Sequence, residues 1–79
     1  MKARIHIGLK PGVLDPQGRT IKRSLAHLGF DGVSKARQGK TIDLDLDFDD
    51  KELAMRKVTQ MCEKLLANTV IENYEIKIT

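Results

Sequence analysis

Ten residues decide the fold of this chain: Leu9-Lys10-Pro11-Gly12-Val13-Leu14-Asp15-Pro16-Gln17-Gly18. They end a strand, make a turn and begin a helix. Pro11 and Gly12 interrupt the extended backbone. Asp15 suits the N-cap of a helix, because its carboxylate accepts hydrogen bonds from backbone N–H groups of the next turn. Pro16 suits the first helical position, where a missing N–H has no cost. We therefore expect a helix to begin at Pro16.

The residues on either side of this stretch predict a strand and a helix. Before it, residues 2–10 alternate between apolar and polar side chains, the pattern of a strand with one buried face. After it, Ile21, Leu25 and Leu28 recur at helical spacing and form one apolar stripe. Gly29 supplies the left-handed residue that ends many helices, so the first helix is expected over residues 16–28.

The second half of the chain predicts a strand hairpin, a helix and a last strand. Residues 33–38 alternate weakly and are expected to form an edge strand, and Gly39-Lys40 is short enough for a two-residue hairpin turn. Residues 41–48 alternate clearly between apolar side chains and Thr or Asp. Asp49 is expected to cap a helix that stops at Asn68, and a last strand is expected near residues 70–78.

The resulting order, β-α-β-β-α-β, predicts a ferredoxin-like α+β fold in one domain over residues 1–79. Both amphipathic helices are expected on one face of a four-stranded antiparallel sheet, which makes a two-layer sandwich. In the expected strand order, fourth-first-third-second, the strand of residues 2–10 lies beside that of residues 41–48. Lys2, Arg4 and His6 are then expected near the aspartates of the neighbouring strand. These aspartates are Asp43, Asp45 and Asp47.

The net charge of +3 hides an uneven distribution. Residues 1–40 contain nine basic and two acidic residues, whereas residues 41–79 contain five basic and nine acidic residues. A basic half is one mark of a nucleic-acid binder. However, the predicted fold brings the two halves together, so we expect the charges to pair and to be solvated. An RNA-recognition module of this topology also carries aromatic residues on its open sheet face. This sequence has Lys, Arg, His and Asp there, so no nucleic-acid partner is expected.

The lone cysteine and the lack of long apolar runs indicate a cytoplasmic protein. Cys62 cannot form an internal disulfide, which agrees with a reducing compartment. It lies within a predicted helix with no histidine at helical spacing, so we expect a buried thiol and not a nucleophile. No apolar run is long enough for a signal peptide or a membrane span, and no membrane partner is expected.

No other group of residues predicts a catalytic site, a bound cofactor or a metal. Gln38-Gly39-Lys40-Thr41 resembles the end of a phosphate-binding loop, but Ser34 replaces the first glycine of that motif and a strand follows. The aspartates of residues 43–50 resemble a calcium loop, but Phe48 and Ala54 stand where that loop needs glycine and glutamate. The residues alone therefore indicate a small α+β module for binding or assembly.

Residues 9–18 closely resemble the opening motif of the PurS family, the small subunit of phosphoribosylformylglycinamidine (FGAM) synthase. Three later blocks resemble the same family in the same order. They are Leu28-Gly29-Phe30 with Gly32-Val33, Gly39-Lys40-Thr41-Ile42, and Cys62-Glu63-Lys64-Leu65-Leu66-Ala67-Asn68 with Val70-Ile71-Glu72-Asn73-Tyr74. The resemblance therefore spans nearly the whole chain. Thr69 stands where the family commonly has proline, and residues 34–38 are more polar than the family pattern.

The resemblance implies a part in purine biosynthesis. Members of this family are non-catalytic subunits of an enzyme that converts formylglycinamide ribonucleotide (FGAR) into FGAM with glutamine and ATP. A PurL-type synthetase and a PurQ-type glutaminase carry the chemistry, and the complex uses ATP, magnesium and glutamine. This chain is expected to bind none of these itself. It is expected to form a homodimer or a larger oligomer, to join the two partners and to support ammonia transfer between them.

Seven residues match the family motifs and are candidates for partner contact: Lys10, Asp15, Pro16, Gly18, Gly39, Lys40 and Asn68. Most also have a local explanation as a helix cap, a turn or a helix stop. Gly18 is unusual, because glycine in the first turn of a helix costs up to about 1 kcal/mol relative to alanine. It therefore predicts the close approach of another backbone. Lys10 and Lys40 have no evident local role.

Two other functions remain open from the residues. One is a free-standing α+β domain that senses a small metabolite at a dimer interface. The other, less favoured, is a nucleic-acid binder.

Overall fold

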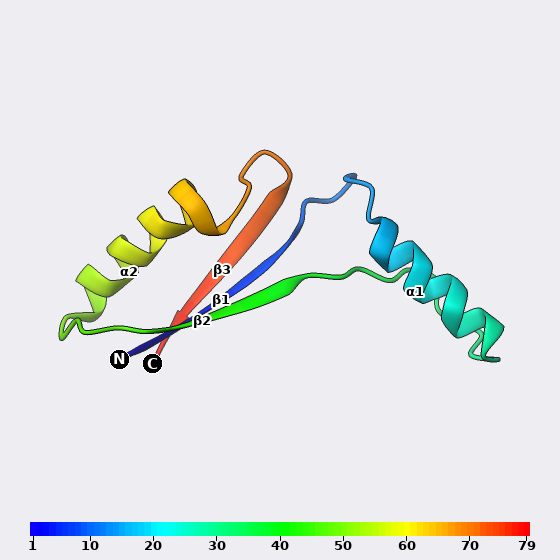
Figure 1. The fold of residues 1–79 in the computed structure, drawn as a ribbon, viewed down its shortest axis with the longest axis horizontal. Coiled ribbons are helices and arrows are strands. Elements are labelled where there is room, and N and C mark those ends of the chain that lie inside the picture. Colours follow the sequence, from blue (N-terminus) through cyan, green and yellow to red (C-terminus); the bar gives the residue numbers. More distant parts are fainter.

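The structure, a computed structural model, describes all 79 residues. It contains β1 (Lys2–Leu9), α1 (Pro16–His27), β2 (Lys40–Asp45), α2 (Lys51–Met61), the π-helical turn η1 (Cys62–Leu66) and β3 (Glu72–Ile78). The strands form one antiparallel sheet in the order β2-β1-β3 (Figure 1). The molecule is elongated, 49 × 24 × 15 Å, because α1 projects beyond the end of the sheet. Neither helix has the length and apolar character needed to cross a membrane.

The central strand, β1, places its apolar side chains on the face of the sheet that α2 covers. Ala3, Ile5 and Ile7 are buried there, while the alternate residues of β1 are exposed. Val58 and Cys62 pack against them from α2 and η1 and are fully buried. Ala54, Ala67 and Ile78 complete this small core. The expected burial of the Cys62 thiol is therefore confirmed.

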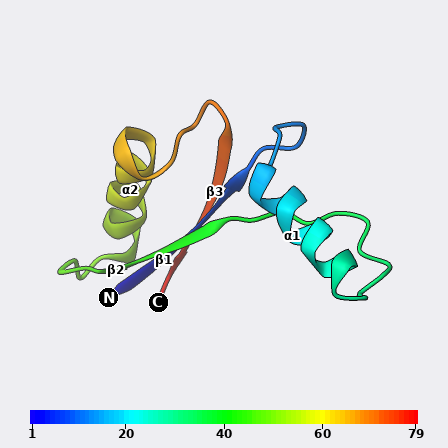
Figure 2. The ribbon, with the colours of Figure 1, turned by 45° about the vertical axis from the view of Figure 1, so that its right-hand side comes forward.

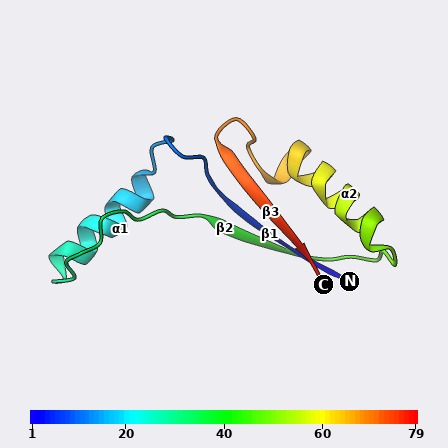
Figure 3. The ribbon, with the colours of Figure 1, turned by 180° about the vertical axis from the view of Figure 1, so that it is seen from behind.

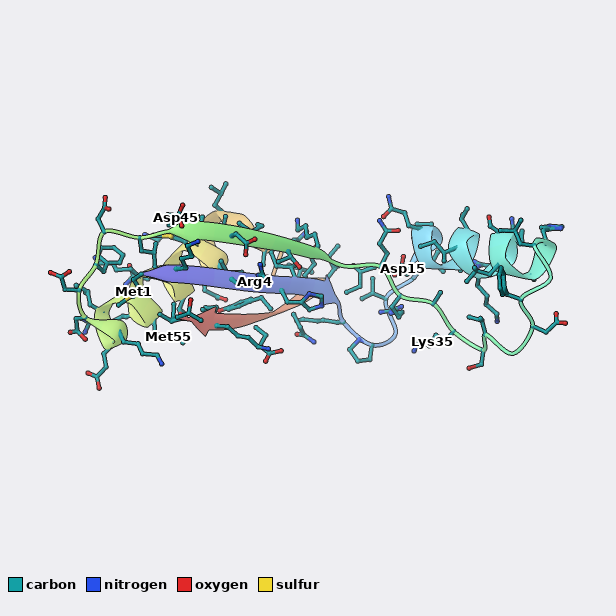
Figure 4. All side chains as sticks on the ribbon, turned by 90° about the horizontal axis from the view of Figure 1, so that it is seen from below. Met1, Arg4, Asp15, Lys35, Asp45 and Met55 are labelled. Atoms are coloured by element: carbon teal, nitrogen blue, oxygen red, sulfur yellow. The ribbon has the colours of Figure 1, made fainter.

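The opposite face of the sheet is open and charged, as expected. Lys2 lies opposite Asp45 in the strand register, and Arg4 lies opposite Asp43. Figure 4 shows Arg4 and Asp45 on these two neighbouring strands. The Arg4 guanidinium donates to the Asp43 carboxylate at 2.8 Å, and this hydrogen bond lowers the pKa of Asp43. His6 lies opposite Thr41 instead of an aspartate, so the predicted pairing holds for two of the three basic residues.

Two parts of the predicted fold are wrong. The sheet has three strands instead of four, because residues 33–38 form no strand. Only α2 covers a face of the sheet, while α1 and the segment after it extend away together (Figure 2). The physical reason is that this segment bonds to α1. Lys22 Nζ donates to the carbonyl of Ser34 at 2.9 Å, and the backbone of Ala36 lies against Gly18.

The predicted hairpin turn at Gly39-Lys40 is also wrong. Without a strand before it there is no hairpin, and Gly39 does not have the positive φ that such a turn needs. Lys40 is instead the first residue of β2.

The ends of α1 agree with the sequence to within one residue. The helix begins at Pro16, and the Asp15 side chain accepts a hydrogen bond from the backbone N–H of Gly18 at 2.8 Å. At the other end Gly29 has φ +92°. The N–H of Phe30 bonds to the carbonyl of Leu25 at 2.9 Å, and that of Gly29 bonds to Ala26 at 3.1 Å. This is the expected glycine stop.

The ends of α2 differ from the prediction. Asp50, not Asp49, is the N-cap and accepts from the N–H of Glu52 at 3.0 Å. At the C-terminus the helix widens into η1, in which the N–H of Ala67 bonds to the carbonyl of Cys62. Asn68 is not a left-handed helix stop, since no residue other than glycine has a positive φ. Its carbonyl accepts from Ile71 and Glu72 and so forms the turn into β3.

Candidate functional site

We call residues 16–38, comprising α1 and the segment that returns from it, the arm. Residues 9–15 lead into the arm, and residues 36–40 contain the last three residues of the arm and lead back to β2. These two segments form the joint (Figures 1 and 3). Four of the seven candidate residues from the sequence, Lys10, Asp15, Gly39 and Lys40, lie in the joint, and Pro16 follows it directly as the first residue of α1. Gly18 lies one helical turn away, and Asn68 lies in the loop before β3.

Asp15 ties the start of α1 to the returning segment. The residue is 6% exposed. One carboxylate oxygen accepts from the N–H of Gly18 and the other accepts from the N–H of Gln38, both at 2.8 Å. These two hydrogen bonds, first that of Gln38 and then that of Gly18, hold the pKa of Asp15 below its ordinary value. Asp15 is therefore more than a helix cap, because it also joins the two segments of the joint (Figure 4).

Arg37 ties the returning segment to the loop that leaves β1. Its guanidinium donates to the carbonyl oxygens of Val13 and Lys10, each at 2.9 Å, and to that of Leu9 at 3.3 Å. Its positive charge also contributes to the lowered pKa of Asp15. Arg37 was not among the candidate residues from the sequence. The one feature of the sequence that pointed to this segment was the unusual polarity of residues 34–38. The partners of Arg37 are backbone carbonyls, which leave no mark in the sequence.

Two glycines let the backbones approach closely at the joint. A Cβ atom on Gly18 would collide with the carbonyl oxygen of Ala36. A Cβ atom on Gly39 would lie 2.6 Å from the carbonyl oxygen of Ile7. In both places the Cβ atom would lie closer to the carbonyl oxygen than Cβ atoms do in real proteins. The expectation that Gly18 marks the close approach of another backbone is thus confirmed, and Gly39 has the same role on the other side of the joint.

The loop before β3 is also tied to the joint, through the backbone of Ile71 and the side chain of Glu72. One oxygen of the Glu72 carboxylate accepts from the N–H of Asn68 at 2.6 Å, and the other lies 3.9 Å from Lys40 Nζ. The N–H of Lys10 bonds to the carbonyl of Ile71 at 2.8 Å. Lys40 therefore does have a local partner. The side chain of Lys10 has none and is the freer of the two lysines to contact another protein.

A shallow depression of about 330 Å³ lies over the joint. It brings together four of the seven candidates, Asp15, Pro16, Gly39 and Lys40, and its remaining polar wall comes from Gln17, Gln38 and Glu72. Lys10, Gly18 and Asn68 do not line it. The carboxylates here are engaged by backbone amides and by a lysine. No group of three or more His, Cys, Asp or Glu side chains is placed to hold a metal ion.

The arm carries apolar residues that nothing in the chain covers. Ile21, Leu28 and Phe30 are 40%, 73% and 60% exposed. On the sheet, Ile42 and Leu44 of β2 lie on the side that α2 covers, yet they are only half-buried. The helix stripe and the sheet face that were expected to pack together are thus both present but remain apart in one chain.

Comparisons with known proteins give a consistent result. Residues 2–79 match the family described as PurS: phosphoribosylformylglycinamidine (FGAM) synthase. The PurS subunit of this synthase from Synechocystis is 50% identical, over 96% of this chain and 76% of the relative. The PurS subunit from Methanocaldococcus jannaschii is 48% identical, over 98% of this chain and 93% of the relative.

Solved structures show the same likeness. The crystal structure of Methanocaldococcus jannaschii PurS superposes with a TM-score of 0.87 at 49% identity, over 96% of this chain and 92% of that one. A chain of PurLQS from Thermotoga maritima superposes with a TM-score of 0.87 at 39% identity, over 96% and 93% of the two chains.

Proposed function

This chain belongs to the PurS family and is a subunit of FGAM synthase, and we propose that its task there is to hold the glutaminase and synthetase subunits together for ammonia transfer. It contributes no catalytic residue and binds no cofactor. ATP, magnesium and glutamine are bound by the partner subunits, and the complex works in the cytoplasm. The solved PurLQS complex of Thermotoga maritima, which contains a chain of this fold, supports such an assembly.

The observation that carries the proposal is the exposed apolar stripe on the arm. The apolar stripe of α1 is left without a partner, and the apolar side chains of β2 pack against the core but stay only half-buried. Large uncovered apolar surfaces mark sites of protein association. A second copy satisfies both surfaces at once, because the arm of each copy then covers the sheet of the other. Such a reciprocal exchange is closed by a two-fold axis, which is the commonest symmetry of small oligomers. The proposed unit is therefore a homodimer.

The joint is the part of the dimer that we assign to partner contact. It gathers four of the seven family-motif residues at one end of the sheet, where the depression and the free Lys10 side chain are accessible. A surface built from backbone turns and a few charges suits recognition better than chemistry, because it lacks a nucleophile with an adjacent base.

The experiment that tests the proposal compares two ammonia sources. Purified PurL-type and PurQ-type subunits are assayed for FGAM synthesis with glutamine or with free ammonia, each with and without this protein. We expect glutamine-driven synthesis to require the protein and ammonia-driven synthesis to proceed without it. Equal rates with and without the protein in the glutamine assay would reject the coupling role. Affinity capture of both subunits by the tagged protein, with glutamine and nucleotide supplied, checks the assembly itself.

A further inference from the structure

Within one chain, the direction of the arm depends on the joint. α1 does not lie on the sheet or on α2, and its nearest support is the segment that returns beside it (Figures 1 and 3). Lys22 and Gly18 hold that segment against α1, so the arm is braced internally. Within the chain, the link that sets its angle to the sheet is the crossing of the two segments of the joint.

Arg37 is placed at this crossing so that it restrains the segment that leaves β1. Between β1 and α1 the chain passes through Pro11 and Gly12, and Gly12 has φ +86°. Within this loop one backbone hydrogen bond holds the turn, from the N–H of Val13 to the carbonyl of Lys10 at 3.1 Å. Three hydrogen bonds from Arg37 bind carbonyls of this segment, and the N–H of Lys10 bonds to the carbonyl of Ile71 at 2.8 Å.

Arg37 and Asp15 act on the joint from its two sides. Asp15 binds the N–H of Gln38, next to Arg37 in the chain, and thereby fixes the returning segment to the start of α1. Arg37 fixes that same segment to the loop that leaves the sheet. The charged guanidinium makes stronger hydrogen bonds to carbonyls than a neutral donor does, and its planar shape presents several N–H groups in fixed directions.

We propose that Arg37 is a positioning residue of the synthase. By binding three carbonyl oxygens of residues 9–13, it fixes the direction in which the arm leaves the sheet, and thereby the geometry in which the subunits meet. The link to the synthase rests on the proposed function above, whereas the effect on the arm is measured without the synthetase and glutaminase subunits. The two parts are tested by separate measurements.

The first measurement is the distance between the arm and the sheet domain. Spin labels are attached at His27→Cys on α1 and Lys57→Cys on α2, both exposed positions, while the buried Cys62 is retained. The labelled protein is diluted with unlabelled protein, and distances are measured by pulsed electron paramagnetic resonance. The dilution ensures that only distances within one chain are recorded. We expect a narrow distribution in the parent protein and a broad one in Arg37→Ala. A distribution as narrow as that of the parent would overturn the proposal.

Two further variants sharpen this test. Arg56→Ala removes an exposed arginine from α2 that makes no hydrogen bond or ion pair, and it should leave the distribution unchanged. Arg37→Lys keeps the charge but replaces two bonding nitrogens with one, so it should restore only part of the narrow distribution. Full restoration would show that charge alone holds the loop and would reject the role of the planar guanidinium.

The second measurement is the pair of synthesis assays. Arg37→Ala should retain the circular dichroism spectrum of the parent and the ammonia-driven rate of the complex. Its glutamine-driven rate should fall about tenfold, within the range of up to about 100-fold that a misplacement of about 1 Å produces. A broadened distance with an unchanged glutamine-driven rate would reject Arg37 as a positioning residue. If the parent protein itself gave no glutamine-driven stimulation, the proposed function would fail while the distance measurement still decided the role of Arg37 in the joint.

Discussion

Gly18 of α1 and Ala36 of the returning segment lie so close that no side chain fits between them, because a Cβ atom on Gly18 would meet the Ala36 carbonyl oxygen. The contact explains why the first turn of a helix contains a glycine despite its conformational cost. It also keeps the returning segment against the arm and away from the sheet, where a fourth strand was expected.

The first prediction concerns Gly18→Ala. The added methyl group must push two backbones apart, so we expect a loss of about 1–3 kcal/mol in the free energy of unfolding. Urea denaturation followed by circular dichroism measures it. Gly8→Ala is the matched control, since a Cβ atom there meets nothing within 4 Å, and its effect should be within about 0.5 kcal/mol. Equal stabilities of the two variants would contradict the close packing at Gly18.

The second prediction concerns stability at acid pH. Folding lowers the pKa of Asp15, chiefly through the hydrogen bond from Gln38, and that of Asp43, chiefly through the hydrogen bond from Arg4. A carboxyl group with a lowered pKa stabilises the fold above its unfolded pKa, and this stabilisation is lost as the pH falls through the folded pKa. The free energy of unfolding should therefore decline below about pH 5.

Single variants separate the two carboxyl groups. Asp15→Asn and Asp43→Asn should each be less stable than the parent at pH 7 and should each show a shallower decline in acid. Denaturant titrations between pH 2 and pH 7 measure both effects. Parallel pH profiles for the parent and Asp15→Asn would mean that the Asp15 carboxylate is not bound as described.

The features of the fold and the site that could be predicted from the sequence are mostly those set by residues close together in the chain. The cap at Asp15, the start at Pro16 and the stop at Gly29 follow from chemistry within one helical turn, and the structure agrees with them. The pairing of β1 with β2 followed from the strand order expected for a β-α-β-β-α-β chain, and alternation along each strand gave the faces.

The errors lie where contacts between distant segments decide the outcome. Residues 33–38 alternate like a weak strand, but Asp15, Gly18 and Lys22 bind that segment to the arm instead. The role of Arg37 could not be predicted because its partners are backbone carbonyls, which every residue has. The choice between Asp49 and Asp50 as the cap of α2 was a matter of one residue, within the usual variation of helix ends.

The third prediction concerns Tyr74, the only tyrosine in a chain without tryptophan. Its hydroxyl donates to the Glu63 carboxylate at 2.7 Å, and this hydrogen bond raises the pKa of Tyr74 to about 12. Absorbance at about 295 nm during alkaline titration should show this one phenol ionising well above the ordinary pKa of about 10. Because the folded pKa is raised, the associated stability is present below the unfolded pKa and is lost as the pH rises through the folded value.

The variant Glu63→Gln tests whether Glu63 causes the raised pKa of Tyr74. The amide still accepts a hydrogen bond but removes the negative charge that opposes ionisation. The pKa of Tyr74 should therefore fall toward about 10 while the protein stays folded. An unchanged pKa in this variant would show that Glu63 is not the source of the shift.

The fourth prediction concerns the proposed homodimer and the apolar stripe of α1. Ile21→Glu places a charge within that stripe, whereas Ala26→Glu places the same charge about 140° round the helix. Burying an isoleucine contributes about 2 kcal/mol, and each dimer has two such sites. Ile21→Glu should therefore raise the dimer dissociation constant about a thousandfold or more, and Ala26→Glu should leave it nearly unchanged.

Sedimentation velocity at micromolar concentration distinguishes these outcomes for the dimer. The parent and Ala26→Glu should sediment as dimers, and Ile21→Glu should sediment as a monomer with its sheet core intact, because Ile21 has no place in that core. A monomeric parent would reject the exchange of arms between two copies. If Ile21→Glu stayed dimeric while Ala26→Glu dissociated, the interface would lie on the opposite face of α1, and the uncovered stripe would need another partner.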